Sequence, residues 1–170
     1  MGSASHQGES IGFANYLETS QKPRYCFCYG LSYGEFVYSD MKISKPEVKP
    51  DELITVSCQV TNVSNADATE IVQCYISDRF ASRTRPVKEL VGFVRVLIPA
   101  GEQLAFTFFS EPSQTAFLDK DMRWKIEKGQ FDVMLGKSSD EICFSKTVQV
   151  TEDAWIDGKR RAFYARTEVR

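Results

Sequence analysis

Residues 53–63 read LITVSCQVTNV, and apolar and polar side chains alternate along most of this stretch. The residues on the apolar face are Ile54, Val56, Cys58 and Val60, opposite Thr55, Ser57, Gln59 and Thr61. A period of two with many β-branched residues is typical of a strand that buries one face. Residues 64–67 (SNAD) then predict a turn, because their short polar side chains bond the nearby backbone.

Strand-like segments of the same kind recur along the chain between Gly, Pro, Asn and Asp turn signals. The expected strands are residues 36–43, 53–63, 69–77, 90–98, 102–109, 130–136 and 142–150. Residues 116–126 predict a hairpin with DKDM at its tip, and no segment shows a sustained helical period. About seven strands that each bury one face predict an all-β fold, an antiparallel β-sandwich.

The hallmarks of an immunoglobulin domain are missing from this pattern. No cysteine occurs in residues 130–136, so no intersheet disulfide reaches that strand. Phe131 occupies the expected position of the tyrosine corner and has no hydroxyl. We expect hydrophobic packing alone to hold the two sheets together.

The chain has 170 residues, 42% of them hydrophobic and 26% charged, and a net charge of −2. This composition indicates a globular domain and excludes a disordered, collagen-like or coiled-coil chain. A (β/α)₈ barrel needs roughly 200 residues or more, so that enzyme scaffold does not fit. The near-neutral charge does not favour nucleic acid, and no apolar run approaches the ~20 residues of a membrane span. The polar start MGSASHQGES lacks the apolar core of a secretory signal.

The five cysteines are Cys26, Cys28, Cys58, Cys74 and Cys143. The last three sit in strand-like runs, where a reduced thiol packs as a small hydrophobe. Cys26 and Cys28 form a C-x-C pair and His6 is the only histidine, so the zinc signal is weak. We expect reduced structural thiols, which favour a cytoplasmic setting, with a Cys58–Cys74 bridge as the alternative. No metal or cofactor is predicted.

Paired carboxylates are the first candidates for catalysis, and Asp119 and Asp121 flank the predicted hairpin tip. A glycosidase needs one carboxyl group whose pKa burial raises, and a sugar-sized cleft between the two. A solvated hairpin tip supplies neither, so we interpret the pair as turn residues. A serine nucleophile would have only His6 as its base, and no Gly-x-Ser-x-Gly or phosphate-binding glycine motif occurs. The residues predict no catalytic site.

Several surface features have a structural and a functional interpretation. In the loop 79–89 four basic residues against Glu89 give a net charge of +3. This loop is either solvated or a docking loop whose arginines bind carboxylates of a neighbouring domain. The sequon at Asn62 matters only in a eukaryotic secretory setting. The C-terminal residues 151–170 form either a mobile tail or a strap, and the aromatic residues that a strap could bury are Trp155, Phe163 and Tyr164.

Aromatic residues make up 12% of the chain, which raises the question of a sugar-stacking surface. Most of them, including Phe106, Phe108, Phe117, Phe131 and Phe144, lie in the inward phase of the predicted strands and are expected in the core. The residues expected to face outward are Tyr75, Trp124 and Trp155.

Three motifs in chain order extend this interpretation. CFCYGLSYGEF (26–36) resembles FPFGYGLSYTxF, the junction that leads into the C-terminal domain of glycoside hydrolase family 3 β-glucosidases and β-xylosidases. SDRFASRTRPVKELVGFVRVLIPAGEQLAFTF (77–108) is similar to that family's SDPxASVxRPxKELKGFxKVxLxPGExxTVxF. AFLDKDMRWKIEKGQFDVMLGKSSDEI (116–142) is similar to its LAFYDxxGxWxVExGxFxVxVGxSSxDI. Cys28 departs from this pattern, because it stands where the family has glycine, and Cys26 replaces proline.

The resemblance implies an Ig-like, fibronectin type III-like sandwich over residues 36–150. It implies that residues 1–35 link this domain to a preceding α/β-sandwich domain, and that residues 151–170 form a C-terminal extension. The catalytic aspartate and glutamate of the family lie in its other domains. The resemblance therefore transfers no catalytic residue, cofactor or metal ligand to this chain.

The function implied by the resemblance is that of a non-catalytic domain in an enzyme of carbohydrate metabolism. Its expected partners are the catalytic domains of the same polypeptide, without nucleic acid, membrane or sugar binding of its own. The interdomain contact is expected over residues 25–36 and the loop 79–93, which predicts an exposed apolar and basic patch there. The residues singled out within these segments are Tyr29, Tyr33, Arg83, Arg85, Lys88 and Phe93. The alternatives are a carbohydrate-binding module and an Ig-like adhesion module.

Overall fold

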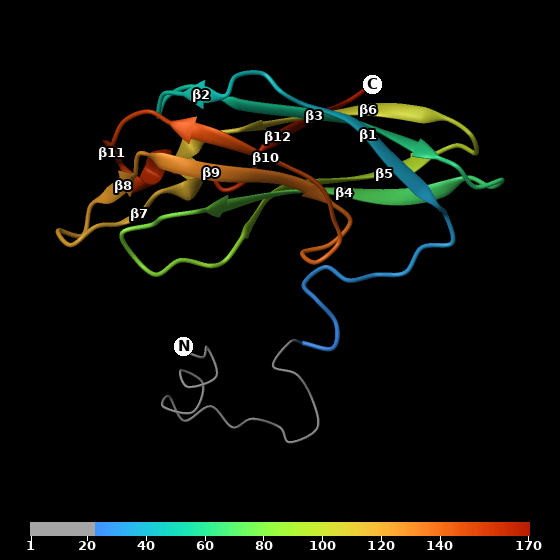
Figure 1. Ribbon diagram of the computed structural model, residues 1–170, viewed down its shortest axis with the longest axis horizontal. Helices are drawn as coiled ribbons and strands as arrows, with labels where there is room; N and C mark the ends of the chain where they lie inside the picture. The colour runs from blue at the N-terminus through green and yellow to red at the C-terminus, as the bar shows by residue number, and fades with distance from the viewer. Residues whose placement is uncertain (1–22) are drawn as a thin grey trace, which may run out of the picture.

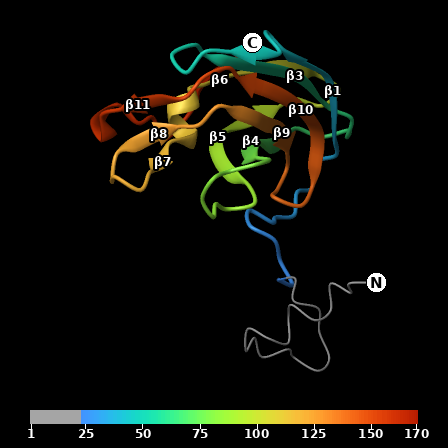
Figure 2. The same ribbon diagram turned by 60° about the vertical axis from the view of Figure 1, so that its left-hand side comes forward.

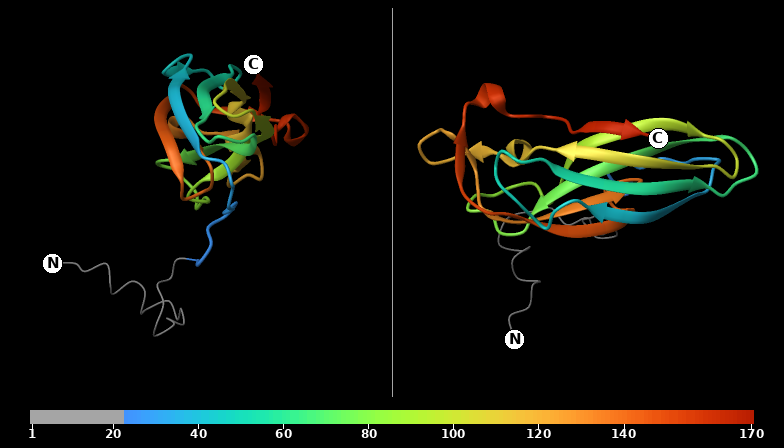
Figure 3. Two further views of the ribbon diagram at one scale, coloured as in Figure 1. Left: turned by 90° about the vertical axis from the view of Figure 1, so that its right-hand side faces the viewer. Right: turned by 90° about the horizontal axis from the view of Figure 1, so that it is seen from above.

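The computed structural model describes residues 23–170 as two β-sheets packed face to face, which confirms the predicted all-β sandwich (Figure 1, Figure 3). The predicted linker up to residue 22, with His6, lies outside the described residues. The helices of the described part are the short 3-10 turns η1 (Pro112–Thr115) and η2 (Gly158–Arg160). No helix in residues 23–170 is long and apolar enough to cross a membrane.

The first sheet is antiparallel throughout, in the order β1-β3-β6-β12. Its strands are β1 (Phe36–Ile43), β3 (Ile54–Asn62), β6 (Gln103–Ser110) and β12 (Arg166–Val169). The alternation seen in the sequence of β3 appears as a burial pattern in which every second residue is buried. A bulge interrupts the pairing of β1 between Ser39 and Lys42, where Asp40 has a φ of 52°.

The second sheet has the order β2-β10-β9-β4-β5. Its strands are β2 (Glu47–Val48), β10 (Ile142–Val150), β9 (Gly129–Gly136), β4 (Ala68–Asp78) and β5 (Glu89–Ile98). A three-stranded sheet projects from one end of the sandwich, opposite the turn between β3 and β4 (Figure 1). It contains β11 (Ala154–Ile156), β8 (Trp124–Ile126) and β7 (Phe117–Leu118).

The long strands agree with the sequence prediction. The strands with eight or more residues are β1, β3, β4, β5, β6, β9 and β10, and each overlaps one of the predicted segments. The hairpin over 116–126 is also confirmed, with β7 and β8 paired around its tip. The two-residue β2 and the strands β11 and β12 were not predicted, since such short segments carry no recognisable period.

The core lies between the two sheets and is built from the inward faces of the long strands. Its largest fully buried side chains include Phe106, Phe108, Phe131, Ile54 and Leu135. Burial of each such side chain contributes roughly 1.5–3 kcal/mol. Burial also raises the pKa of the Cys58 thiol to about 12 and raises that of Cys74. All five cysteines are free, so the alternative of a Cys58–Cys74 bridge is wrong.

The C-terminal residues form a strap along the sandwich, and not a mobile tail. β11 pairs with β8, β12 completes the first sheet beside β6 (Figure 3), and Ala165 N donates to Val91 O of the second sheet at 2.6 Å. The expectation that the strap buries its aromatic residues is wrong, because they remain exposed. These residues are Trp155, Phe163 and Tyr164.

The sequon asparagine has a structural role. Asn62 is fully buried, and its Nδ2 donates to the carbonyl oxygens of Ala66 and Ile98, both at 2.9 Å. Its Oδ1 accepts from Ser64 N at 3.0 Å. The side chain therefore fixes the turn after β3 and is not accessible to a glycosylating enzyme in the folded chain.

Candidate interdomain contact surface

The segment that precedes β1 runs beneath the second sheet, on the side of β4 and β9 (Figure 1, Figure 2). Ser139 N donates to Phe27 O at 3.1 Å, and the Cys26 thiol donates to Ser138 Oγ at 3.3 Å. Cys28 has a φ of 61°, so this position keeps the left-handed backbone for which the family pattern has glycine. The junction is therefore held to the turn between β9 and β10.

The side chains of this segment point largely into solvent. Tyr29 is 51% exposed and packs against Tyr25 in a tilted arrangement, with ring centroids 5.2 Å apart. Leu31 is 90% exposed, and Tyr33 is fully exposed. Large apolar side chains are normally buried, so a run of exposed ones makes this segment a candidate interaction surface.

The outer face of β4 and β5 continues this apolar surface. Phe93 lies opposite Gln73 in the pairing of the two strands, and Ile71 lies opposite Arg95. Phe93, Leu97 and Ile71 are each more than 40% exposed. We call the exposed side chains of this face, of residues 25–33 and of the loop 79–88 the basal surface.

The basic loop 79–88 lies below the same sheet (Figure 2). Most of its charged side chains bind partners within the domain. The Arg85 guanidinium donates to Glu89 Oε1 at 2.7 Å and to the carbonyl oxygen of Thr115, and lies 5.3 Å from the Phe117 ring centre. Lys88 Nζ donates to Ser139 O. The expectation that these two cations lie free at the surface is therefore wrong, because acceptors inside the domain bind them.

The remaining residues of the loop are more exposed. Arg79 pairs with Asp132 at 2.7 Å, and this contact raises the pKa of Arg79. Arg83 is exposed and forms no ion pair within residues 23–170. Phe80 and Val87 are each more than 80% exposed. The basal surface is thus mainly apolar and aromatic, with Arg83 as the loop's free cation in the described part of the chain.

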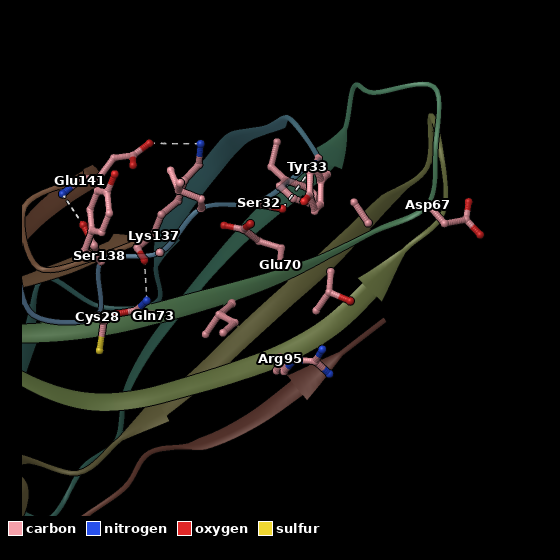
Figure 4. Close-up of a pocket in the computed structure, with 18 residues that line it drawn as sticks. Cys28, Ser32, Tyr33, Asp67, Glu70, Gln73, Arg95, Lys137, Ser138 and Glu141 are labelled. Atoms are coloured by element: carbon pink, nitrogen blue, oxygen red, sulfur yellow. Dashed lines mark hydrogen bonds and ion pairs between the residues drawn. The ribbon is translucent and has the colours of Figure 1, made fainter.

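An open pocket of about 640 Å³ lies between the segment that precedes β1, which we call the junction segment, and the second sheet (Figure 4). Residues 28–34 form one wall, β4 and Arg95 of β5 form the opposite wall, and the turn 137–141 closes one end. The segment approaches β4 closely at Gly34, where an added Cβ would lie 2.3 Å from the Ala68 Cβ. A larger residue at position 34 would therefore push this wall away from the sheet.

Glu70 is the buried carboxylate of this pocket, with only 5% of its surface exposed. Tyr38 Oη donates to its Oε1 at 2.7 Å. Burial raises the pKa of Glu70, although the Tyr38 hydrogen bond and Lys137 act in the opposite direction. Burial also raises the pKa of Tyr38, which is therefore a hydrogen-bond donor at neutral pH.

The carboxylates at the hairpin tip stabilise the turn, as the sequence predicts. Asp119 Oδ1 accepts from the backbone N–H groups of Asp121 and Arg123, and its Oδ2 accepts from Trp155 Nε1 at 2.9 Å. These hydrogen bonds, with that from Arg123 the largest cause, lower the pKa of Asp119. A lowered pKa is the opposite of what a general acid requires. Within the described residues no group of three His, Cys, Asp or Glu side chains could hold a metal ion.

The residues considered for sugar stacking do not form a platform. Tyr75 lies on the outer face of β4, but it is only 1% exposed because the segment around Cys28 lies against it, so the expectation that it is available at the surface is wrong. Trp124 is half-buried, with the Arg161 guanidinium 4.9 Å from its ring centre. Trp155 is exposed, as predicted, and is the single indole at the surface of residues 23–170.

Two residues of the basal surface, Ile71 and Leu97, lie outside the segments predicted for the contact. One signal was present in β5, which reads ELVGFVRVLI and is apolar on both faces. Strands that are apolar on both faces are typical of sheets covered on both sides. The open pocket that contains the buried Glu70 has no comparable sequence signal, since an isolated glutamate in a strand is common.

This architecture defines the class of the protein, a fibronectin type III-like β-sandwich, and residues 70–139 match the family model of the fibronectin type III-like domain. The thermostable beta-glucosidase B of Acetivibrio thermocellus is 35% identical over 151 residues, which are 88% of this chain and 20% of that protein. A beta-glucosidase of Listeria innocua, solved with isofagomine, aligns with a TM-score of 0.75 and 32% identity over 84% of this chain and 20% of that one.

A further solved relative is the GH3 beta-glucosidase of Bifidobacterium adolescentis, with a TM-score of 0.69 and 33% identity over 74% of this chain and 18% of that one. This chain is a C-terminal fibronectin type III-like domain of glycoside hydrolase family 3. It spans about a fifth of the length of the relatives it matches.

Proposed function

We propose that this chain is a non-catalytic domain that packs against and stabilises the catalytic domains of a family 3 glycosidase of the β-glucosidase type, in carbohydrate metabolism. The observation that supports this most directly is the basal surface. It gathers ten exposed large apolar residues beneath one sheet: Tyr25, Phe27, Tyr29, Leu31, Tyr33, Ile71, Phe80, Val87, Phe93 and Leu97. A surface of this kind favours association with a protein partner.

The chemistry of the described residues supports the same proposal. The hairpin carboxylates have a structural role, and Glu70 is a single buried acid hydrogen-bonded to Tyr38. A family 3 partner would therefore supply the reacting groups. The purified chain should give no turnover of aryl β-glucosides or aryl β-xylosides above background, and measurable turnover would refute a non-catalytic role.

A chimera tests the stabilising role. The segment of the Acetivibrio thermocellus enzyme that matches this chain is deleted, or replaced by this chain, and the half-life of aryl-glucosidase activity is measured at elevated temperature. We expect deletion to shorten the half-life strongly and replacement to restore most of it. Equal half-lives for the deletion and the replacement would contradict the proposal.

The basal surface is tested within the same chimera. Phe93→Asp places a charge in the proposed contact and should shorten the half-life at least tenfold. Phe163→Asp is the matched control, because Phe163 is also exposed, at 66% against 53% for Phe93, but lies on the C-terminal strap. A larger effect of the Phe163 variant would place the contact on the strap.

A further inference from the structure

The pocket beneath β4 combines a buried acid with an apolar wall. Glu70 lies in the middle of the ring of lining residues (Figure 4), and its second carboxylate oxygen accepts no hydrogen bond within residues 23–170. Leu31, Tyr33 and Ile71 line the same pocket and are exposed. The second oxygen of Glu70 is not among the buried side-chain atoms of residues 23–170 that lack a partner, so it is open to the pocket and can accept a hydrogen bond from a donor that enters.

The cations near Glu70 neutralise little of the negative charge of its carboxylate. The acids that line the pocket are Asp67, Glu70 and Glu141, and the cations are Arg95 and Lys137. Lys137 favours the charged form of Glu70, but its Nζ pairs with Glu141 Oε1 at 3.2 Å. Arg95 is exposed and makes no ion pair within the described part of the chain. The lining therefore has a net charge of −1, and its most buried member is the acid.

We infer that this pocket binds a guanidinium or ammonium group on an aliphatic stem, with the charged head at Glu70 and the stem along Leu31 of the opposite wall. Arginine and lysine side chains combine these two features, since their stems pack on apolar surface while their heads bond carboxylates. The occupant is an arginine or lysine side chain of the packed neighbouring domain; this assignment rests on the proposed function. The pocket would then be the polar centre of an otherwise apolar contact.

Titration with agmatine, a guanidinium on a four-carbon stem, tests the site on the full chain alone. Two-dimensional amide NMR at low salt should show saturable shifts at residues 28–34 and 137–141, with a dissociation constant on the order of millimolar. Glu70→Gln should weaken this binding at least tenfold, and Glu47→Gln, a change at an exposed acid outside the pocket, should leave it unchanged. Glucose, which is neutral, should give no saturable shift.

The same spectra report whether Glu70→Gln is folded. If it is not, Tyr38→Phe gives a second test, because it keeps the carboxylate, removes its internal donor, and should bind agmatine at least as tightly as the unmodified chain. Absence of saturable shifts at the pocket, equal affinity in the Glu70→Gln variant, or stronger shifts with glucose would each overturn the inference. The test needs no catalytic domain, so its failure would leave the chimera result unaffected.

Discussion

Left-handed backbone at residues other than glycine occurs in the segment before β1, in the bulge of β1 and at the tip of the hairpin between β7 and β8. In residues 23–170 such a φ occurs at Cys28, Asp40 and Met122. Two of these, Cys28 and Met122, align with glycines of the family motifs. The left-handed conformation costs a residue with a Cβ about 1–2 kcal/mol, so the chain keeps the family geometry at these positions despite the substitution.

Met122→Gly should stabilise the domain by up to about 1 kcal/mol. Relief of the left-handed strain exceeds the ~0.5–1 kcal/mol entropic cost of glycine, and the Met122 side chain is 73% exposed, so little packing is lost. Urea unfolding followed by tryptophan fluorescence measures the change. Lys120→Gly in the same turn, where φ is not positive, is the control and should destabilise. A loss of stability in the Met122 variant as large as that of the control would contradict the strain argument.

Glu70 should make stability fall as the pH rises from about 4 toward 7. Its pKa is above the ordinary value of about 4.3, so the folded state binds its proton more tightly than the unfolded state. The loss of stability begins as the pH passes the ordinary pKa of the unfolded state and is complete once the pH exceeds the raised pKa of the folded state. Glu70→Gln lacks this titration, so its unfolding free energy relative to the unmodified chain should be higher at pH 7 than at pH 4.

Asp132→Asn provides a control of the opposite sign for the pH series. Burial acts to raise the pKa of Asp132, but hydrogen bonds from Arg79 and Thr147 outweigh it and hold the pKa below its usual range. The stability that Asp132 contributes is present above its unfolded pKa and lost as the pH falls through the folded one. The Asn variant should therefore lose stability at neutral pH and little in acid. The same pH trend in both variants would contradict the assignment.

At the scale of secondary structure elements, the strap is the feature with the largest expected effect on stability. β12 covers the edge of β6, and Ala105 and Arg170 exchange two backbone hydrogen bonds at 2.8 and 2.9 Å. Without β12, β6 becomes an exposed edge strand, and such edges promote association. The strap therefore both stabilises the first sheet and protects its edge.

Truncation before Arg166 should lower the unfolding free energy by roughly 2–4 kcal/mol, at about 1 kcal/mol net for each lost hydrogen bond. Urea denaturation gives the energy, and light scattering reports the association of the exposed edge. The control is Glu168→Ala with Arg170→Ala, which removes the two ion pairs of Glu168, with Arg166 and with Arg170, and keeps the strand. That change should cost less than about 1 kcal/mol. A truncated chain as stable as the control would show that β12 is dispensable.

At the scale of the whole molecule, the sandwich could be predicted because its long strands alternate with period two, as in β3. The strap strand β12 reads RTEV, whose composition does not distinguish a strand from a loop. The prediction that Tyr75 lies on the outer face of its strand was correct, but the junction segment covers it, and no local sequence pattern reports such a contact. For the same reason the sequence did not separate Arg85, which binds Glu89, from Arg83, which stays exposed.

The central claim is that the basal surface is where catalytic domains pack, and hydroxyl-radical footprinting of the chain alone and within the chimera tests it most directly. Aromatic side chains react with hydroxyl radicals in proportion to their exposure, so a contact appears as a loss of reactivity. We predict that Tyr29, Tyr33 and Phe93 become protected in the chimera, while Trp155 and Tyr164 react as they do in the chain alone. Unchanged reactivity at the first three residues, or protection confined to Trp155 and Tyr164, would contradict the account.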